Sequence, residues 1–462
     1  MIRAAIAARI HYLDLADARS FVAGFSVLDG AARAAAVVAL TGASSTPALS
    51  NAALDKLTAG WRQVDRVAIA IAPGNRAPRG LSVVRSILSY AGRPVRVFVG
   101  RRWSERPGWG LTVRRAMPGL GKRWLSPSET PDLDIIPERF AVRDSVIFRA
   151  GLELAVLHLG LLAASLAVRF GLLRSLAPMA RLFRAVAAAF TPFGTDRGGM
   201  TVDAIGLDAR ARPIRGTWSL VAEAADGPFV PTLPAIAALR GLADGRIARA
   251  GASACVGVLS LEDIEAEFRR HRITSSIRFE HPSPSLYETA LGAAFQDLPE
   301  PLRKLHGPGW GRQASGMAQI DGANTVLARL AAAAFHLPRA SASVAVCVRI
   351  TQGPQTERWT RDFGGARFTS VLSASKTPGH VIERFGPFAF ELGLDVGPQG
   401  ISAMPVRAWR FGPLPLPQRL APISIASEST DAAGRFCFDV EMQLPFGLGR
   451  LVRYRGWLDG DA

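Results

Sequence analysis

The chain has 462 residues, of which 48% are hydrophobic and 20% charged, and its formal net charge is +17. This length exceeds the size at which one hydrophobic core stops growing, so we expect two or three globular domains and exclude a disordered chain. The basic residues are dispersed and almost all arginine, the only lysines being Lys56, Lys122, Lys304 and Lys376. Because no basic tract is interleaved with aromatic residues, a codon bias explains the charge better than a nucleic-acid partner does.

The three cysteines are far apart, and each lies in an apolar, strand-like run: Cys255, Cys347 and Cys437. This pattern is typical of small buried side chains, whereas zinc sites and disulfide frameworks need closer spacing or even numbers. The amino terminus has no secretory apolar region, because Arg9 and Asp14 interrupt its only apolar stretch. We therefore expect a cytoplasmic protein without a metal site.

Residues 1–100 alternate the signals of strands and helices. Apolar residues recur at helical spacing behind Asp17 and again after Pro78. Short apolar runs, typical of buried parallel strands, separate these segments at residues 10–15, 37–41, 64–72 and 95–99. This βαβαβαβ order predicts part of a doubly wound parallel sheet.

Residues 101–143 are rich in Pro, Gly, Trp and Arg, and we expect them to form a connecting region. Two helical segments follow at 154–168 and 170–190. The first is about 22 Å long, too short to cross a bilayer core of about 30 Å. The second has leucines on one side and arginines on the other, which fits a buried helix pair and also fits peripheral membrane contact through 170–190. Length favours the buried pair.

Residues 101–273 as a whole predict an inserted α+β domain. After the helix pair, it should contain an antiparallel strand pair, a helix, a strand and a final helix that begins with a capping-box-like run, at residues 200–205, 217–222, 234–243, 254–259 and 260–270. The proline- and serine-rich stretch 274–285 predicts a linker and a domain boundary.

Residues 286–462 predict a β-rich domain. Helix signals at 286–298 and 325–335 precede many short strands separated by Gly and Pro, at residues 344–350, 355–360, 366–372, 381–385, 388–394, 402–410, 423–428, 435–443 and 451–457. Such a succession predicts a curved antiparallel sheet or partial barrel, with the helices covering one side.

Three stretches of the first half resemble one known family. They are HYLDLAD at residues 11–17, LTGASSTPALS at 40–50, and the segment 150–200 with the strand pair behind it. Over about residues 1–272 they are similar to the saccharopine-dehydrogenase-like oxidoreductases. The resemblance implies a Rossmann-like nucleotide-binding domain over 1–100 and a saccharopine-dehydrogenase-like α+β domain over 101–273, with NAD or NADP as cofactor.

The glycine-rich phosphate cradle of that family is missing. Gly307 and Gly309 begin a G-x-G-x-x-G pattern, but Arg312 takes its last position and no strand–helix unit follows. In the family, this cradle would lie upstream of Met1. We therefore expect a truncated or inactive form that binds no cofactor as written, and that would use NAD or NADP only with about ninety further residues restored.

What could remain of a cofactor site is the loop of Gly42, Ser44 and Ser45 at the carboxyl end of a predicted parallel strand, with Asp14 at the end of its neighbour. Turn and helix-capping chemistry explains the same residues without any cofactor. His158, inside an apolar helix, is expected to be a core histidine. No spacing indicates a catalytic set, so the catalytic residues are unassigned.

The carboxyl-terminal part resembles a bacterial domain of unknown function that is fused behind saccharopine-dehydrogenase-like chains. Stretches such as ERWTRDFGG and GRFCFDVEMQLP carry this resemblance. In the first, strand alternation places Glu357, Trp359 and Arg361 on one face. These residues fit cross-strand charge pairs on a solvated face, or a ligand-binding cradle of aromatic residues with a few fixed charges.

Two functions therefore remain open. One is a saccharopine-dehydrogenase-like NAD(P)-dependent oxidoreductase scaffold. The other is a non-enzymatic binding protein whose β-rich cradle takes an apolar or acidic small ligand, at a membrane surface if 170–190 makes peripheral contact. In both cases we expect a small-molecule ligand and no nucleic acid, and an uncovered strand edge would allow a homodimer.

Overall fold

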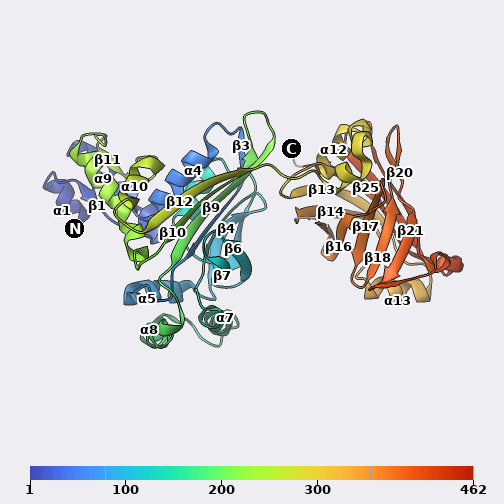
Figure 1. Ribbon diagram of the computed structural model, residues 1–462, viewed down its shortest axis with the longest axis horizontal. Helices are drawn as coiled ribbons and strands as arrows, with labels where there is room; N and C mark the ends of the chain where they lie inside the picture. The colour runs from blue at the N-terminus through green and yellow to red at the C-terminus, as the bar shows by residue number, and fades with distance from the viewer. Residues whose placement is uncertain (79, 354–355, 461–462) are drawn as a thin grey trace. The chain divides into compact units, whose positions relative to one another are not determined.

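The computed structural model describes residues 1–78, 80–353 and 356–460, and the chain divides into two compact units, Met1–His281 and Pro282–Ala462 (Figure 1). Each unit has a large hydrophobic core built from its own residues. The fold is mixed, with a parallel sheet and a mixed sheet in the first unit and a large antiparallel sheet in the second.

A small parallel sheet opens the first unit. Its strand order is β1-β2-β11, with bounds Tyr12–Leu13, Val38–Thr41 and Gly251–Ala254. A separate small core around Ile6, Phe25 and Ala39 joins it to α1 (Ile2–Ala7) and α3 (Asp29–Ala34). Helix α2 (Arg19–Ala23) contacts this core through Phe21, whose ring centre lies 6.1 Å from that of Phe25. The third strand thus comes from far along the chain.

The main sheet of the first unit is mixed. Its path is β12-β10-β9-β3-β8-β4-β5, with bounds Ile273–Glu280, Pro213–Ala222, Gly198–Leu207, Gln63–Ala72, Ser145–Ala150, Pro94–Val99 and Trp103–Pro107. The hairpin of β6 (Val113–Met117) and β7 (Gly121–Pro127) joins it through β8. The antiparallel pair β9 and β10 confirms the predicted strand pair.

The expectation of one doubly wound sheet for the first four strands is wrong. Strand β3 runs parallel to β8 but antiparallel to β9, and β4 runs antiparallel to both of its neighbours. Of these four strands, only β1 and β2 lie in the same parallel sheet. A strand covered on both faces has the same apolar run in either kind of sheet, so its sequence does not reveal the direction of its partners.

The prediction of a connecting region at 101–143 is also wrong, because these residues form β5, β6, β7 and helix α6 (Asp132–Arg139). The residues of β5 and β6 are mostly exposed or half-buried and include several arginines. Strands on a wet surface lack the apolar alternation by which strands are recognised.

One face of the mixed sheet is covered by helices (Figure 1). Val67, Val202 and Trp218 point into the core on that side, where α4, α6 and α10 pack. Helix α4 spans Ser50–Thr58, and α10 spans Leu261–Phe268 with the predicted Ser260–Asp263 capping box, while α9 (Leu233–Ala243) packs on α10. On the opposite face, the β6–β7 hairpin packs through Met117 and Leu125.

Three further helices form a layer with its own core around Leu88, Trp109 and Leu161. They are α5 (Leu81–Tyr90), α7 (Ala155–Arg169) and α8 (Ala180–Ala189). The helix expected over 170–190 is shorter than predicted, and the helix pair is only partly buried, because Phe170, Leu172, Leu182 and others are exposed. Within the described ranges, no helix is long and apolar enough to cross a membrane.

Most of the predicted linker at 274–285 is instead strand β12, which pairs with β10 along its length. It is an edge strand whose residues are mostly exposed, so it carries hydroxyls where a buried strand would carry apolar residues. The connection between the units is residues 281–285. Whether the first unit contains a further domain boundary near residue 100 stays a prediction.

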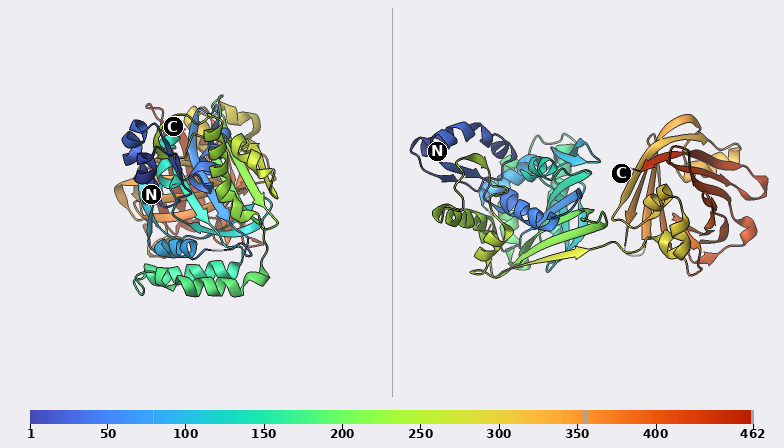
Figure 2. Two further views of the ribbon diagram at one scale, coloured as in Figure 1. Left: turned by 90° about the vertical axis from the view of Figure 1, so that its left-hand side faces the viewer. Right: turned by 90° about the horizontal axis from the view of Figure 1, so that it is seen from above.

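The second unit is built on one antiparallel sheet, which curves strongly (Figure 2). Its order is β19-β20-β23-β24-β25-β13-β14-β15-β16-β17-β18-β21-β22, with bounds Asp395–Gly397, Gly400–Ala403, Ile423–Thr430, Phe436–Gln443, Arg450–Gly460, Arg312–Asp321, Ser341–Gln352, Thr356–Phe363, Ala366–Ala374, His380–Phe385, Phe388–Gly393, Val406–Phe411 and Leu414–Pro415. The prediction of a curved antiparallel sheet is confirmed. The strand expected at 402–410 is two strands, because Met404 and Pro405 leave the ladder.

Helices α11 (Leu286–Leu291), α12 (Glu300–His306) and α13 (Val326–Ala334) complete the second unit. The first begins with a capping box of Ser285 and Glu288, and Thr325 caps the last. Leu286, Tyr287, Leu302 and Leu305 pack from α11 and α12 into the core of the sheet.

Candidate ligand-binding sites

Asp14 and the loop after β2 meet at the carboxyl ends of β1 and β2, as the sequence predicts. The Asp14 Oδ1 atom accepts hydrogen bonds from the Gly42 N–H at 2.9 Å and from the Thr41 hydroxyl at 2.7 Å. Gly42 has a φ of +71°, and a Cβ there would lie 2.6 Å from Cδ of Pro47. The carboxylate and the glycine therefore shape this loop.

Ser44 and Ser45 are buried in the same loop. Behind them, the Asn51 side chain donates to the Pro47 carbonyl at 2.9 Å and to Oδ1 of Asp132 at 3.0 Å. Burial raises the pKa of Asp132 to about 7. Polar groups here are mostly engaged in holding the loop, so few remain to contact a dinucleotide.

His158 is a core residue, as the sequence favours. The Leu152 N–H donates to its Nδ1 atom at 3.3 Å, so Nε2 carries the proton and donates to the Ser126 hydroxyl at 2.9 Å. Burial lowers the pKa of His158 to about 4 and keeps it neutral. Across the described residues, no group of three or more His, Cys, Asp or Glu side chains could hold a metal ion.

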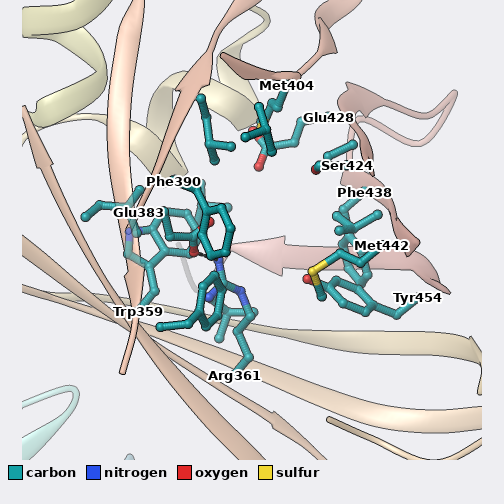
Figure 3. A pocket seen from close by; sticks show the side chains of 18 of the residues that line it. Trp359, Arg361, Glu383, Phe390, Met404, Ser424, Glu428, Phe438, Met442 and Tyr454 are labelled. Atoms are coloured by element: carbon teal, nitrogen blue, oxygen red, sulfur yellow. Dashed lines mark hydrogen bonds and ion pairs between the residues drawn. The ribbon is translucent and has the colours of Figure 1, made fainter. Parts of the chain in front are cut away.

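A cavity of about 130 Å³ lies inside the second unit (Figure 3). Its walls include Ser424 of β23 and Val406 of β21, which are far apart in the strand order and meet because the sheet curves round them. Most of the lining is apolar, including Leu305, Val348, Phe363, Leu372, Phe385, Phe390, Leu392, Met404, Ala426, Phe438 and Met442. The polar lining residues are Tyr287, Trp359, Arg361, Glu383, Ser424, Glu428 and Tyr454.

Strand β15 carries the three residues that the sequence singles out for ligand binding. Trp359 and Arg361 line the cavity, whereas Glu357 is fully buried behind them. The Glu357 carboxylate accepts hydrogen bonds from Arg312 at 3.0 Å and from the indole N–H of Trp359 at 3.2 Å. Glu357 thus fixes the orientation of the tryptophan ring instead of facing the cavity.

Arg361 is the one cation among the lining residues, and it is already paired. Its guanidinium donates to the Glu383 carboxylate at 3.2 Å (Figure 3). It also donates to the Ser370 hydroxyl at 2.8 Å. Burial disfavours the charged form, but the neighbouring Glu383 outweighs it, and the net effect raises the pKa of Arg361. Its charge is therefore neutralised within the protein.

Glu428 enters the cavity wall with a histidine behind it. The His306 Nε2 atom donates to Oε2 of Glu428 at 2.6 Å, and the imidazole stacks on Tyr287 with ring centres 3.8 Å apart. His306 has no exposed surface, and no described residue bonds to its Nδ1 atom. Sequence reasoning missed these three residues, because they come from β23, α12 and α11 and no local spacing relates them.

Two tyrosines, Tyr287 and Tyr454, are among the residues that line the cavity. Burial, reinforced by Glu428 and other carboxylates, raises the pKa of Tyr287 well above its usual value, and burial raises the pKa of Tyr454 to about 12. Both hydroxyls stay protonated at neutral pH. Neither makes a hydrogen bond to another residue in the described part of the chain, so both can pair with a ligand.

One protein-family model matches the part of the chain that contains this cavity. Residues 298–458 match the family described as a domain of unknown function, DUF4166. This range includes every cavity residue named above except Tyr287. This confirms that the carboxyl-terminal part resembles a domain of unknown function. No curated protein matches the chain.

Among solved structures, the chain is similar to apo saccharopine dehydrogenase (L-Glu forming) from Saccharomyces cerevisiae. The two share 11% identity with a TM-score of 0.42, over 60% of this chain and 81% of that one. The neighbour bears the family name that the first half of the sequence suggests. A likeness this distant carries no argument about activity.

Proposed function

We propose that the second unit binds a small, mostly apolar molecule with an uncharged hydroxyl-bearing end. The observation that supports this is the cavity around Trp359, whose walls are mainly aliphatic and aromatic. Ligand sites of this kind combine an apolar lining with a few polar groups that orient the ligand. Here the free phenols of Tyr287 and Tyr454 are the orienting groups.

Charge decides between an apolar and an acidic ligand. The lining contains one cation, Arg361, against two carboxylates, Glu383 and Glu428, and the cation is paired with the first of them. A ligand carboxylate would have to face this surplus of negative charge away from water, which is unfavourable. A neutral hydroxyl can instead donate to Glu428 and accept from a tyrosine.

Size limits the part of the ligand that is enclosed. A cavity of about 150 Å³ lined by apolar side chains takes up benzene. The volume of about 130 Å³ therefore suits one ring or a short branched chain. Ring-sized molecules are suitable probes.

Benzyl alcohol, toluene and benzoate form a matched set of probes for the whole chain. We expect benzyl alcohol to bind with a dissociation constant of about 1 mM, toluene more weakly and benzoate not measurably. Tyr454→Phe should weaken the binding of benzyl alcohol about 2- to 10-fold, which corresponds to the net value of one hydrogen bond. The affinity for toluene should not change. Ligand-observed NMR or calorimetry measures all three.

Two further variants make the result specific. Ala426→Phe places a ring in the cavity and should abolish binding of every probe, while thermal unfolding checks that the variant is folded. Tyr12→Phe, in the first unit, is the control for Tyr454→Phe and should change nothing. The proposal fails if benzoate binds as well as benzyl alcohol, or if Ala426→Phe binds like the wild type.

For the first unit, we propose an oxidoreductase scaffold of saccharopine-dehydrogenase type as the second candidate function. What supports it is the position of Asp14, Gly42, Ser44 and Ser45 at the carboxyl ends of parallel strands, the edge where such sheets bind ligands. These residues do not fit NAD or NADP by themselves, because Asp14 and Gly42 are engaged in the loop.

We therefore expect this chain to bind NADH and NADPH weakly. Without backbone amides at a glycine-rich helix start, the pyrophosphate lacks its main anchor. Fluorescence titration should give no dissociation constant below about 10 μM, equivalent to about 7 kcal/mol. Tighter binding that is lost in the Asp14→Ala variant would contradict this expectation. It would support Asp14, Gly42, Ser44 and Ser45 as a cofactor site.

A further inference from the structure

The first unit contains a larger cavity, of about 560 Å³, between the sheet face opposite the helices and the β6–β7 hairpin. Ala68 and Ala70 of β3 form its floor together with polar residues of β9, β10 and β12. Met117 and Leu125 border it from the hairpin. Its volume lies in the range of small-molecule sites, about 300–1,000 Å³.

The charges around this cavity do not balance. Arg215 is paired with Asp203 at 2.6 Å, and Arg278 with Glu280 at 2.9 Å. These pairs account for both carboxylates of the lining. Arg149 of β8 and Arg115 of β6 line the same cavity and are left in surplus.

Arg149 is the unusual member of the set. None of its guanidinium nitrogens bonds to another described residue, and its Nε atom is buried without a partner. Burial lowers the pKa of Arg149 to about 10, and the nearby Arg115 adds to the effect. Keeping a partly buried guanidinium without a counter-charge is costly, so a protein that retains one gains if an anion can reach it.

The sheet floor adds hydroxyl groups beside the arginines. Thr201 donates to no described residue, and the Ser219 and Ser276 hydroxyls, 2.9 Å apart, bond to each other and leave one proton free. Thr217 is different, because its hydroxyl is engaged with Asp203. Cationic forks with neighbouring hydroxyl donors are the groups that recognise carboxylates and phosphates.

We propose that this cavity binds a small organic anion, whose carboxylate or phosphate group pairs with Arg149 and Arg115. The alanines, Met117 and Leu125 would contact the uncharged part of the molecule. The inference is independent of both proposed functions, because this cavity shares no lining residue with the cavity of the second unit or with the loop of Asp14, Gly42, Ser44 and Ser45.

Calorimetry or thermal unfolding of the whole chain with succinate, benzyl phosphate and uncharged succinamide tests the proposal. We expect at least one of the two anions to bind and to raise the melting temperature, with succinamide inactive. The anion that binds more tightly identifies the head group as carboxylate or phosphate. Inorganic phosphate is included to separate recognition of a free ion from that of an organic anion.

Arg149→Met should weaken the binding of the anion at least tenfold. The ligand-free variant should be as stable as the wild type or more stable, because an apolar side chain replaces an uncompensated charge. Arg278→Gln, which removes an exposed and already paired cation from the same lining, is the control and should change the affinity less than threefold. A purely structural arginine would show the opposite result, a loss of stability in the Met variant.

Three results on binding and stability would overturn the proposal. They are the absence of binding by both anions, equal binding by Arg149→Met, and a clear destabilisation of the ligand-free Met variant. A dimer that becomes a monomer on substitution of Arg149 would also overturn it, because the face would then contact a second copy of the chain.

Discussion

Asp132 shows at the scale of one residue what burial does to a carboxyl group. It has no exposed surface, its Oδ2 atom has no partner among the described residues, and its pKa is about 7. Because the folded pKa lies above the unfolded value of about 3.9, the unfolded chain releases this proton first as pH rises. Asp132 therefore lowers stability progressively between about pH 4 and pH 7.

We predict that Asp132→Asn raises the free energy of unfolding by about 2–4 kcal/mol at pH 8, and that its advantage disappears near pH 4. The amide keeps the acceptor for Asn51 but cannot ionise. Urea unfolding at pH 4.5, 6 and 8 measures the effect. Asp55→Asn, at a partly exposed carboxylate, is the control. A variant that is less stable than the wild type at pH 8 would show that the carboxylate has a partner in solution.

At the scale of elements, α7, α8 and the segments that follow each of them leave apolar side chains uncovered. Phe170 and Leu172 are 73% and 79% exposed, and Leu182 and Phe193 are exposed as well. Residues 154–195 contain four arginines and no acidic residue. An apolar and basic surface matches an anionic lipid headgroup layer in both character and charge. We propose that this helix pair makes peripheral membrane contact.

We predict that the chain cosediments with phosphatidylcholine vesicles that contain phosphatidylserine, and much less with phosphatidylcholine alone. Replacing Arg181 and Arg184 by glutamine should weaken binding about 30-fold, from about 1 kcal/mol per arginine. Leu172→Asp should weaken it further, whereas Val27→Asp, at an exposed valine elsewhere in the unit, should not. Equal binding to both vesicles, or no loss in the Arg variant, would contradict the prediction.

At the scale of the whole molecule, the two units are joined by residues 281–285, which belong to no helix or strand. His281, Ser283 and Pro284 are exposed, whereas Ser285 is buried as the cap of α11. Exposed connections are where proteases cut first, since the backbone must enter the enzyme as an extended strand.

We predict that brief digestion with a protease of broad specificity cuts between residues 281 and 284 and leaves a carboxyl-terminal fragment of about 180 residues. Mass spectrometry locates the cut. The edge strand β12 lies next to this site, and its pairing with β10 should protect residues 273–280. First cuts inside β12, or within the sheet of the second unit, would show that the units are divided elsewhere.

Periodic elements could be predicted from the sequence because their signals are local. The capping box at Ser260, the pair β9 and β10 and most strands of the second unit agree with the structure for this reason. The edge strand β12 and the β6–β7 hairpin were missed. Strands β12 and β6 are mostly exposed, and a strand shows regular apolar alternation only where one of its faces is buried along its length.

For the sites, the sequence by itself determined that Glu357, Trp359 and Arg361 share one face of a strand, since alternation is a property of the strand alone. Only the tertiary structure decided that Glu357 turns away from the cavity, and that Tyr287, His306 and Glu428 converge on it. In the first unit, it placed Arg149 and Arg115 in one cavity whose two carboxylates pair with other arginines. Residues from different elements meet through the packing and curvature of whole sheets, and no local spacing records that geometry.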